Sequence, residues 1–142
     1  MVQPRILTFN FHEPYLCLMA QTGLEMDVGI YTEAKLAHPW QTFYRDIPPN
    51  LTLLSEQQWR EGLAANKYDV VICHNEMNAQ SVFNVKCAKL LVCHNRRTFI
   101  NSNASVDEGD PIDMFGRLLV KLQEAFEFVF ISESKKVDYG VP

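Results

Sequence analysis

DVVICHN at residues 69–75 and KLLVCHN at residues 89–95 are near-copies of one phrase, 20 positions apart. Each is a short run rich in Val, Ile and Leu that ends in Cys-His-Asn, which is typical of a strand buried on both faces of a parallel sheet. The residues between the copies can form a helix, so the pair predicts a strand, a crossover helix and a parallel strand. Both Cys-His-Asn triplets would then lie at the carboxyl ends of neighbouring strands, where open α/β sheets bind ligands.

The same alternation of apolar runs and helical stretches continues on both sides of this unit. It predicts a three-layer α/β sandwich, a single Rossmann-like domain over residues 1–142 with a mostly parallel sheet of about six strands. Besides the two runs quoted above, the expected strands cover residues 5–10, 26–31, 51–54 and 127–132. The expected helices cover residues 13–22, 55–66, 76–85, 112–125 and 133–138.

Composition limits the class of protein. The chain has 142 residues, 47% of them hydrophobic, which indicates a globular domain and not a disordered chain. The formal net charge of −4 argues against nucleic-acid binding and against an anionic membrane surface, since both need a basic face. The cysteines lack CxxC spacing, no signal peptide precedes the first strand, and no apolar run approaches the roughly 20 residues of a membrane span. We therefore expect a cytoplasmic protein with reduced cysteines and no transmembrane segment.

His74 and His94 are the first candidates for chemistry. Neighbouring residues of a strand point to opposite faces, so each histidine points away from the cysteine before it, and we expect no Cys2His2 zinc site and no bound metal. One interpretation gives both imidazoles a structural role, in which they cap strand ends through backbone hydrogen bonds. The other makes His94 a general base, because imidazole titrates near neutral pH, and lets His74 bind or position substrate.

The turn after the first expected strand, Asn10-Phe11-His12-Glu13, contains no glycine. A Rossmann nucleotide site carries G-x-G-x-x-G at this turn, so that the backbone can approach a pyrophosphate. NAD, FAD and S-adenosylmethionine are therefore disfavoured here, and we expect no cofactor. The N-terminus of the following helix still attracts anions. Asn10, His12 and Glu13 are candidate substrate-binding residues, and the alternative is an ordinary solvated turn.

More polar residues follow the two repeated strands. Asn75 closes the first copy, and Asn95, Arg96 and Arg97 lead from the second copy into a long loop. An arginine pair beside histidines suits a phosphate, a carboxylate or sugar hydroxyls. The alternative is that the two arginines are solvent-exposed and offset the negative charge of the acidic patch at residues 107–110.

Two further sets have both a structural and a functional interpretation. Ser132 is either a ligand contact at the end of the last strand or the N-cap of the last helix. The aromatic residues Trp40, Phe43 and Tyr44 lie in the irregular stretch 32–50. They either pack this loop against the core or form a lid or an acceptor-binding surface.

The order of these features resembles the N-terminal half of a GT-B glycosyltransferase of the retaining family 4 type. The likeness covers most of the chain, best from Lys67 to Pro142, and depends on the order and spacing of loose motifs. These motifs are KYDVVICHN at residues 67–75, KLLVCHNRRTF at 89–99, FVFISES at 128–134 and YGVP at 139–142.

The resemblance implies transfer of a sugar from a nucleotide-sugar donor to a sugar, lipid-linked or small-molecule acceptor, without a metal. It gives the acceptor to this domain and the nucleotide to a second domain. That second domain would lie beyond Pro142, so we expect the chain alone to be inactive. By position, His94 corresponds to the family's histidine that lines the sugar site, and His74 to the preceding position on the neighbouring strand. The turn at residues 10–14 corresponds to a loop that faces the donor phosphates, but it lacks the family's glycines.

Two other classes of function stay open. The chain could be a stand-alone α/β binding or regulatory module for a small anion, using the same sheet edge. It could also be a nucleotide-dependent oxidoreductase or methyltransferase on a Rossmann sheet, although the turn without glycine counts against that class.

Overall fold

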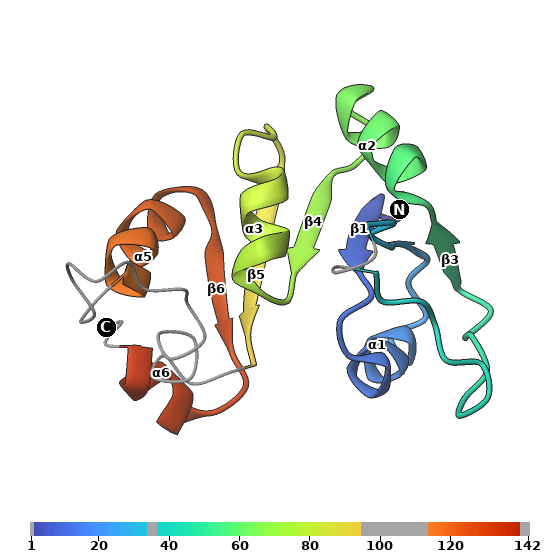
Figure 1. Cartoon of the computed structure of the whole chain (residues 1–142), viewed down its shortest axis with the longest axis horizontal. Helices are drawn as coiled ribbons and strands as arrows, with labels where there is room; N and C mark the ends of the chain where they lie inside the picture. Colours follow the sequence, from blue (N-terminus) through green and yellow to red (C-terminus); the bar gives the residue numbers. More distant parts are fainter. Residues whose placement is uncertain (1, 34–36, 95–113, 140–142) are drawn as a thin grey trace. The chain divides into compact units, whose positions relative to one another are not determined.

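The computed structural model describes residues 2–33, 37–94 and 114–139. Six strands form one sheet in the order β3-β2-β1-β4-β5-β6, the order of a Rossmann fold with its switch between β1 and β4 (Figure 1). The pairs β1–β2, β1–β4, β2–β3 and β5–β6 run parallel. The strands are β1 (Ile6–Phe9), β2 (Met26–Gly29), β3 (Leu51–Leu54), β4 (Val70–Cys73), β5 (Ala88–Cys93) and β6 (Glu127–Phe130).

Five helices of the described chain alternate with these strands and flank the sheet. They are α1 (Glu13–Ala20), α2 (Glu56–Ala64), α3 (Glu76–Val82), α5 (Met114–Ala125) and α6 (Glu133–Tyr139). The α/β class and the parallel sheet predicted from the sequence are therefore confirmed. The observed elements start and end within a few residues of the expected ones.

The chain divides into two compact units. The first unit comprises Met1–Ile72 and Asn84–Ala88, and the second comprises Cys73–Phe83 and Lys89–Pro142.

The core of the first unit lies between its parallel strands and α1. All four residues of β1 are buried, as expected for a strand covered on both faces. A cluster of buried apolar side chains joins this strand to its neighbours and to the loop after β2. Its members are Ile6, Leu16, Ala20, Met26, Val28, Trp40 and Leu51.

An aromatic cluster packs against the carboxyl end of β2. The Trp59 ring on α2 meets Phe9 edge-to-face at 5.2 Å and Tyr31 at 5.4 Å between centroids. Gly29, the last residue of β2, allows this approach. A Cβ atom there would lie 2.9 Å from Trp59 Cδ1 and 3.1 Å from Phe9 Cδ1, closer than normal packing permits.

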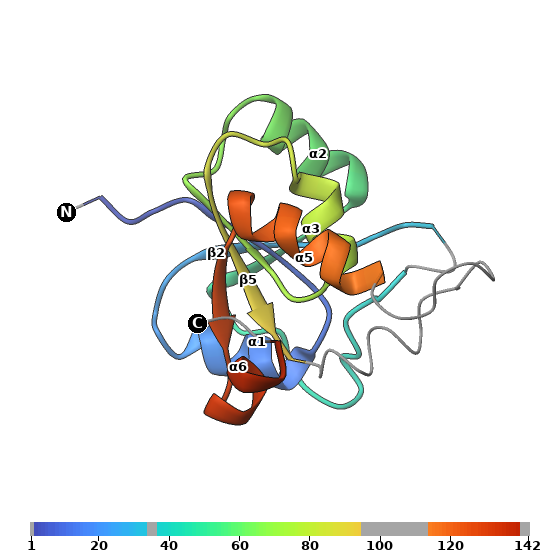
Figure 2. The same ribbon diagram turned by 90° about the vertical axis from the view of Figure 1, so that its left-hand side faces the viewer.

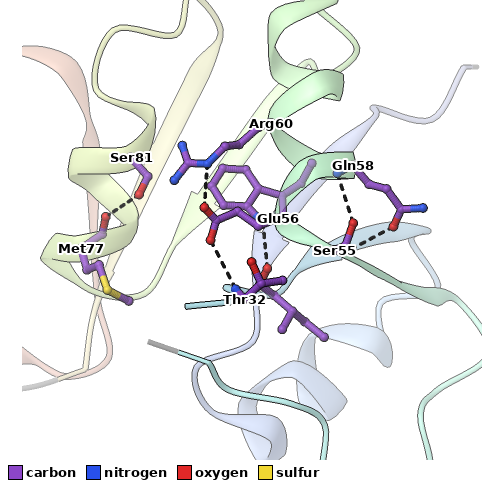
Figure 3. Close-up of polar contacts among 9 residues, drawn as sticks. Thr32, Ser55, Glu56, Gln58, Arg60, Met77 and Ser81 are labelled. Atoms are coloured by element: carbon purple, nitrogen blue, oxygen red, sulfur yellow. Dashed lines mark hydrogen bonds and ion pairs between the residues drawn. The ribbon is translucent and has the colours of Figure 1, made fainter. Parts of the chain in front are cut away.

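Local hydrogen bonds hold α2 at this position. Ser55 and Gln58 form a reciprocal capping box at the start of the helix, as Figure 3 shows. Glu56 accepts a hydrogen bond from the Thr32 backbone N–H at 3.3 Å. Its carboxylate also forms an ion pair with Arg60 at 3.0 Å. The first turn of α2 is thus tied to the chain that leaves β2.

The amino ends of β1 and β4 are joined by a charged pair. The Arg5 guanidinium donates to both oxygens of Asp69, at 2.9 and 3.1 Å, and the Arg5 backbone N–H donates to Asp69 Oδ2 at 2.8 Å. Hydrogen bonds from the Arg5 side chain and backbone lower the pKa of Asp69 to about 2.

The second unit places α6 at the carboxyl end of β5, in both views (Figures 1 and 2). Tyr139, at the end of α6, is buried and packs edge-to-face on Phe130 at 5.5 Å. Nearer the start of β5, the buried Lys89 ammonium donates to the Phe83 carbonyl oxygen at 2.6 Å and lies 5.2 Å from the centroid of the Phe126 ring. The cation is held by an oxygen and an aromatic face.

Substituting Gly29 by alanine should destabilise the protein by about 1–3 kcal/mol, because the added methyl group must push Trp59 or Phe9 out of place. Urea unfolding of the wild type and the variant measures this free energy. Thr52→Ala, at an exposed position of the neighbouring strand, is the control and should change the free energy by less than about 0.5 kcal/mol. Equal values for both variants would contradict the close contact at Gly29.

Asp69 should make the stability of the protein depend on pH. Its pKa in the folded chain lies below the ordinary value of about 3.9, so its contribution is fully present above about pH 4 and lost as the pH falls to about 2. The difference in urea midpoint between the wild type and Asp69→Asn should therefore be present at neutral pH and disappear near pH 2. A difference that stays constant over this range would show that the ion pair with Arg5 adds no stability.

Candidate functional site

The two histidines of the repeated phrase meet at the carboxyl ends of β4 and β5. His74 Nδ1 lies 3.0 Å from His94 Nε2, a hydrogen-bonding distance, and the ring planes are inclined by 34°. His74 is only 3% exposed, and His94 is half-buried. Residues 20 positions apart in the sequence thus form one pair of side chains.

The backbone around His74 is held by the first turn of α3. Asn75 is the N-cap, and its side-chain oxygen accepts from the Asn78 N–H at 2.8 Å. The Asn78 side-chain oxygen in turn accepts from the His74 backbone N–H at 3.1 Å. Asn78 is 1% exposed, so these two hydrogen bonds are buried and hold the His74 backbone at the strand end.

The contact between the two rings restricts their protons. One of the facing nitrogens must carry a hydrogen and the other must present its lone pair. If both rings were imidazolium, two N–H groups would face each other at 3.0 Å, which breaks the bond and adds repulsion. The pair therefore holds at most one positive charge while the bond persists.

A buried thiol precedes His94 in the chain, and a buried phenol lies against that thiol. The Tyr139 hydroxyl hydrogen-bonds to the Cys93 thiol, and both side chains are almost fully buried. Burial raises the pKa of Cys93 to about 11, although the bond from Tyr139 works in the opposite direction. Burial also raises the pKa of Tyr139, and the neighbouring Cys93 adds to this effect. Both groups stay protonated near neutral pH, so Cys93 is a structural thiol and not a nucleophile.

In the first unit, Asn10 follows β1 and is 5% exposed. Its backbone N–H donates to the Gly29 carbonyl oxygen at 3.1 Å, and its side-chain Nδ2 donates to the His38 carbonyl oxygen at 2.5 Å. Its side-chain oxygen Oδ1 is buried and has no hydrogen-bond partner among the described residues. Such a buried acceptor suits a donor group brought by a ligand or a water molecule.

His12 and Glu13 serve local structure in the first unit. His12 is the N-cap of α1, and its Nδ1 accepts from the Tyr15 N–H at 3.3 Å. Glu13 accepts from the Gln41 backbone N–H at 2.6 Å and pairs with Arg45 at 3.9 Å. Glu13 therefore holds the loop after β2, a contact that its place in the sequence did not reveal.

The remaining sequence candidates separate into two groups. Ser132 precedes α6, and its hydroxyl accepts from the Lys135 N–H at 3.3 Å, as expected for a cap. The three residues after His94, which are Asn95, Arg96 and Arg97, lie outside the described residues.

The amino ends of the strands in the first unit hold a different polar cluster. Asp27 accepts from Lys67 at 2.7 Å and from the Tyr68 hydroxyl at 2.8 Å, beside a cavity of about 330 Å³. Burial and the bond to Asp27 raise the pKa of Tyr68. This cavity lies at the edge opposite to the carboxyl end of β1, so it does not coincide with the site predicted from the sequence.

The part of the chain that the structure describes offers neither a metal site nor a membrane-spanning helix. No group of three or more His, Cys, Asp or Glu side chains is arranged to hold a metal ion. None of the helices in this part is long and apolar enough to cross a bilayer.

Sequence reasoning missed Asn78 as the partner of the His74 backbone and Tyr139 as the partner of Cys93. Asn75 is a good N-cap residue, and a polar residue three positions later is the local signal for the first. Nothing local in the sequence indicates that Tyr139 contacts Cys93, which lies 46 positions earlier.

Comparisons with protein families, with curated proteins and with solved structures gave no match for this chain.

The bond between the two histidines should appear as a coupling energy in a double-mutant cycle. His74→Ala, His94→Ala and the double variant should give a coupling of about 0.5–1.5 kcal/mol in the free energy of unfolding, the value of one hydrogen bond. His38→Ala, at an exposed position, is the single-substitution control and should change the free energy by less than about 0.5 kcal/mol. Additive effects of the two histidine substitutions would show that the rings do not interact.

Proposed function

We propose that this chain is the acceptor-side domain of a glycosyltransferase, which transfers a sugar from a nucleotide-sugar donor to an acceptor. The observation that carries the proposal is the hydrogen bond between His74 and His94 at the ends of β4 and β5. It joins, by side-chain contact, the two positions that the family resemblance singles out. The strand order of a Rossmann fold also supports the proposal.

The proposed role of His94 follows from its partner. When His94 Nε2 donates to His74 Nδ1, the neutral His94 ring carries its lone pair on Nδ1. That atom would accept the proton of an acceptor hydroxyl as the hydroxyl oxygen bonds to the sugar carbon, while the bond from that carbon to the phosphate oxygen breaks and the nucleotide leaves. His74 would then stabilise the imidazolium, because its Nδ1 already accepts a hydrogen bond from His94. His74 is thus a positioning residue, and His94 is the proposed base.

The proposal assigns the acceptor to this chain and the nucleotide mainly to a second domain, so the chain alone is proposed to be inactive. The acceptor would be a sugar, a lipid-linked sugar or a small molecule. We place the reaction in the cytoplasm, because none of the four cysteines, Cys17, Cys73, Cys87 and Cys93, forms a disulfide bond in the described residues.

One observation also favours a second candidate, a stand-alone module that binds a small ligand. The buried Asn10 Oδ1 suits a ligand that donates a hydrogen bond, whether or not chemistry follows. The intact mass of the protein from its native source separates the two candidates. A mass near twice 16.4 kDa or above supports the transferase, and a mass of 16.4 kDa supports the binding module.

Substitution of His94 by alanine in the protein as it occurs in its native source should lower turnover by about 10²–10⁴-fold, the usual effect of losing a general base. The assay follows a labelled sugar from a mixture of nucleotide-sugars into acceptors of the same source. His38→Ala removes an exposed imidazole and is the matched control, which should keep full activity. Full activity of the His94 variant would rule out its role as the base.

A further inference from the structure

The loop after β2 is held firmly at its base in the first unit. The Trp40 indole is 7% exposed, belongs to the core cluster and donates its N–H to the Arg45 carbonyl oxygen at 3.0 Å. Glu13 binds the Gln41 N–H at 2.6 Å, and Asn10 binds the His38 carbonyl oxygen at 2.5 Å. The loop is therefore anchored to the turn that follows β1.

This anchored loop presents two aromatic rings to solvent. Phe43 is 91% exposed and Tyr44 is 76% exposed, and their rings meet edge-to-face with centroids 5.3 Å apart. Leaving a phenylalanine in water gives up the burial energy that a core position would provide. The hydrogen bonds of Tyr44 N and Arg45 N to the Gln41 carbonyl oxygen hold the backbone of the tip in a turn. We call Phe43 and Tyr44 the aromatic pair.

Size and charge indicate the class of occupant. Two rings are too small for a stable protein interface, which buries about 800 Å² on each partner. An anionic membrane requires a cluster of cations, whereas Arg45 is engaged by Glu13 and is followed by the acidic Asp46. A single sugar ring has the size of one aromatic ring. Its C–H groups, made slightly positive by the neighbouring oxygens, are attracted to the negative face of an aromatic ring.

The loop also lies at an edge of the sheet where ligands bind. Asn10 and Glu13 tie the loop to the carboxyl end of β1, the edge where parallel sheets bind ligands. We propose that the aromatic pair stacks against a pyranose ring of a neutral saccharide acceptor. This inference rests on the proposed function, and it adds that the acceptor is itself a saccharide, recognised through the apolar face of its ring.

Nuclear magnetic resonance of the 142-residue chain tests the proposal, with methyl glucopyranoside, methyl mannopyranoside and methyl galactopyranoside as probes. At least one glycoside should shift the aromatic signals of Phe43 and Tyr44 and receive saturation from them on its ring C–H protons. The double variant with Phe43→Ala and Tyr44→Ala should lose about tenfold or more in affinity for that glycoside. The substituted side chains are exposed, so the variant should fold, which circular dichroism checks.

Two control variants sharpen the comparison. Tyr44→Phe keeps the ring and should keep the binding, because stacking does not need the hydroxyl group. Val137→Ala removes an exposed apolar side chain from α6 of the second unit and should also bind as the wild type does. The proposal is overturned if no glycoside shifts the signals of the aromatic pair, or if the double variant binds as tightly as the wild type. It is also overturned if the pair responds only to phosphatidylglycerol vesicles.

These outcomes are distinguishable from those of the His94 test. If turnover depends on His94 but no glycoside shifts the aromatic pair, the proposed function stands and the saccharide site fails. If a glycoside binds the aromatic pair but the native protein transfers no sugar, the saccharide site stands and the transferase fails.

Discussion

Parallel pairing is the constraint on which the candidate site depends. Strands that run in one direction end at one edge of their sheet, so the residues that follow them become neighbours however far apart they lie in sequence. In this chain the rule places His74 and His94 within 3.0 Å, although a helix separates the strands that carry them. The same rule requires apolar residues on both faces, and β1, buried at all four positions, meets that requirement.

The polar groups of the described chain divide by their place along the strands. Where strands of the first unit begin, Arg5 pairs with Asp69, and Asp27 pairs with Lys67 and Tyr68, so charges there are largely satisfied within the protein. Where strands end, the groups are two imidazoles in the second unit and a carboxamide with an unpartnered oxygen in the first. Satisfied charges stabilise a fold, whereas titratable or unpartnered groups can still act on a ligand.

Several side chains first considered for ligand binding are occupied with local structure. His12 caps α1, Ser132 caps α6, and Glu13 holds the loop that carries the aromatic pair. These roles explain why polar residues gather at strand ends even without a ligand, because every helix that starts there needs acceptors for its first N–H groups. His74 differs from these residues, because its buried ring hydrogen-bonds to the imidazole of His94.

The sequence by itself determined the elements and the class of fold, because apolar periodicity and caps are local signals. The repeated phrase even predicted which two strand ends would be neighbours. Only the tertiary structure decided which nitrogens of His74 and His94 face each other and that Tyr139 lies against Cys93. It also showed that Trp40 is buried while Phe43 and Tyr44 are exposed, although all three lie in one irregular stretch. Side-chain direction in a loop and contacts between distant residues follow from packing across the whole unit, and no short window of sequence contains that information.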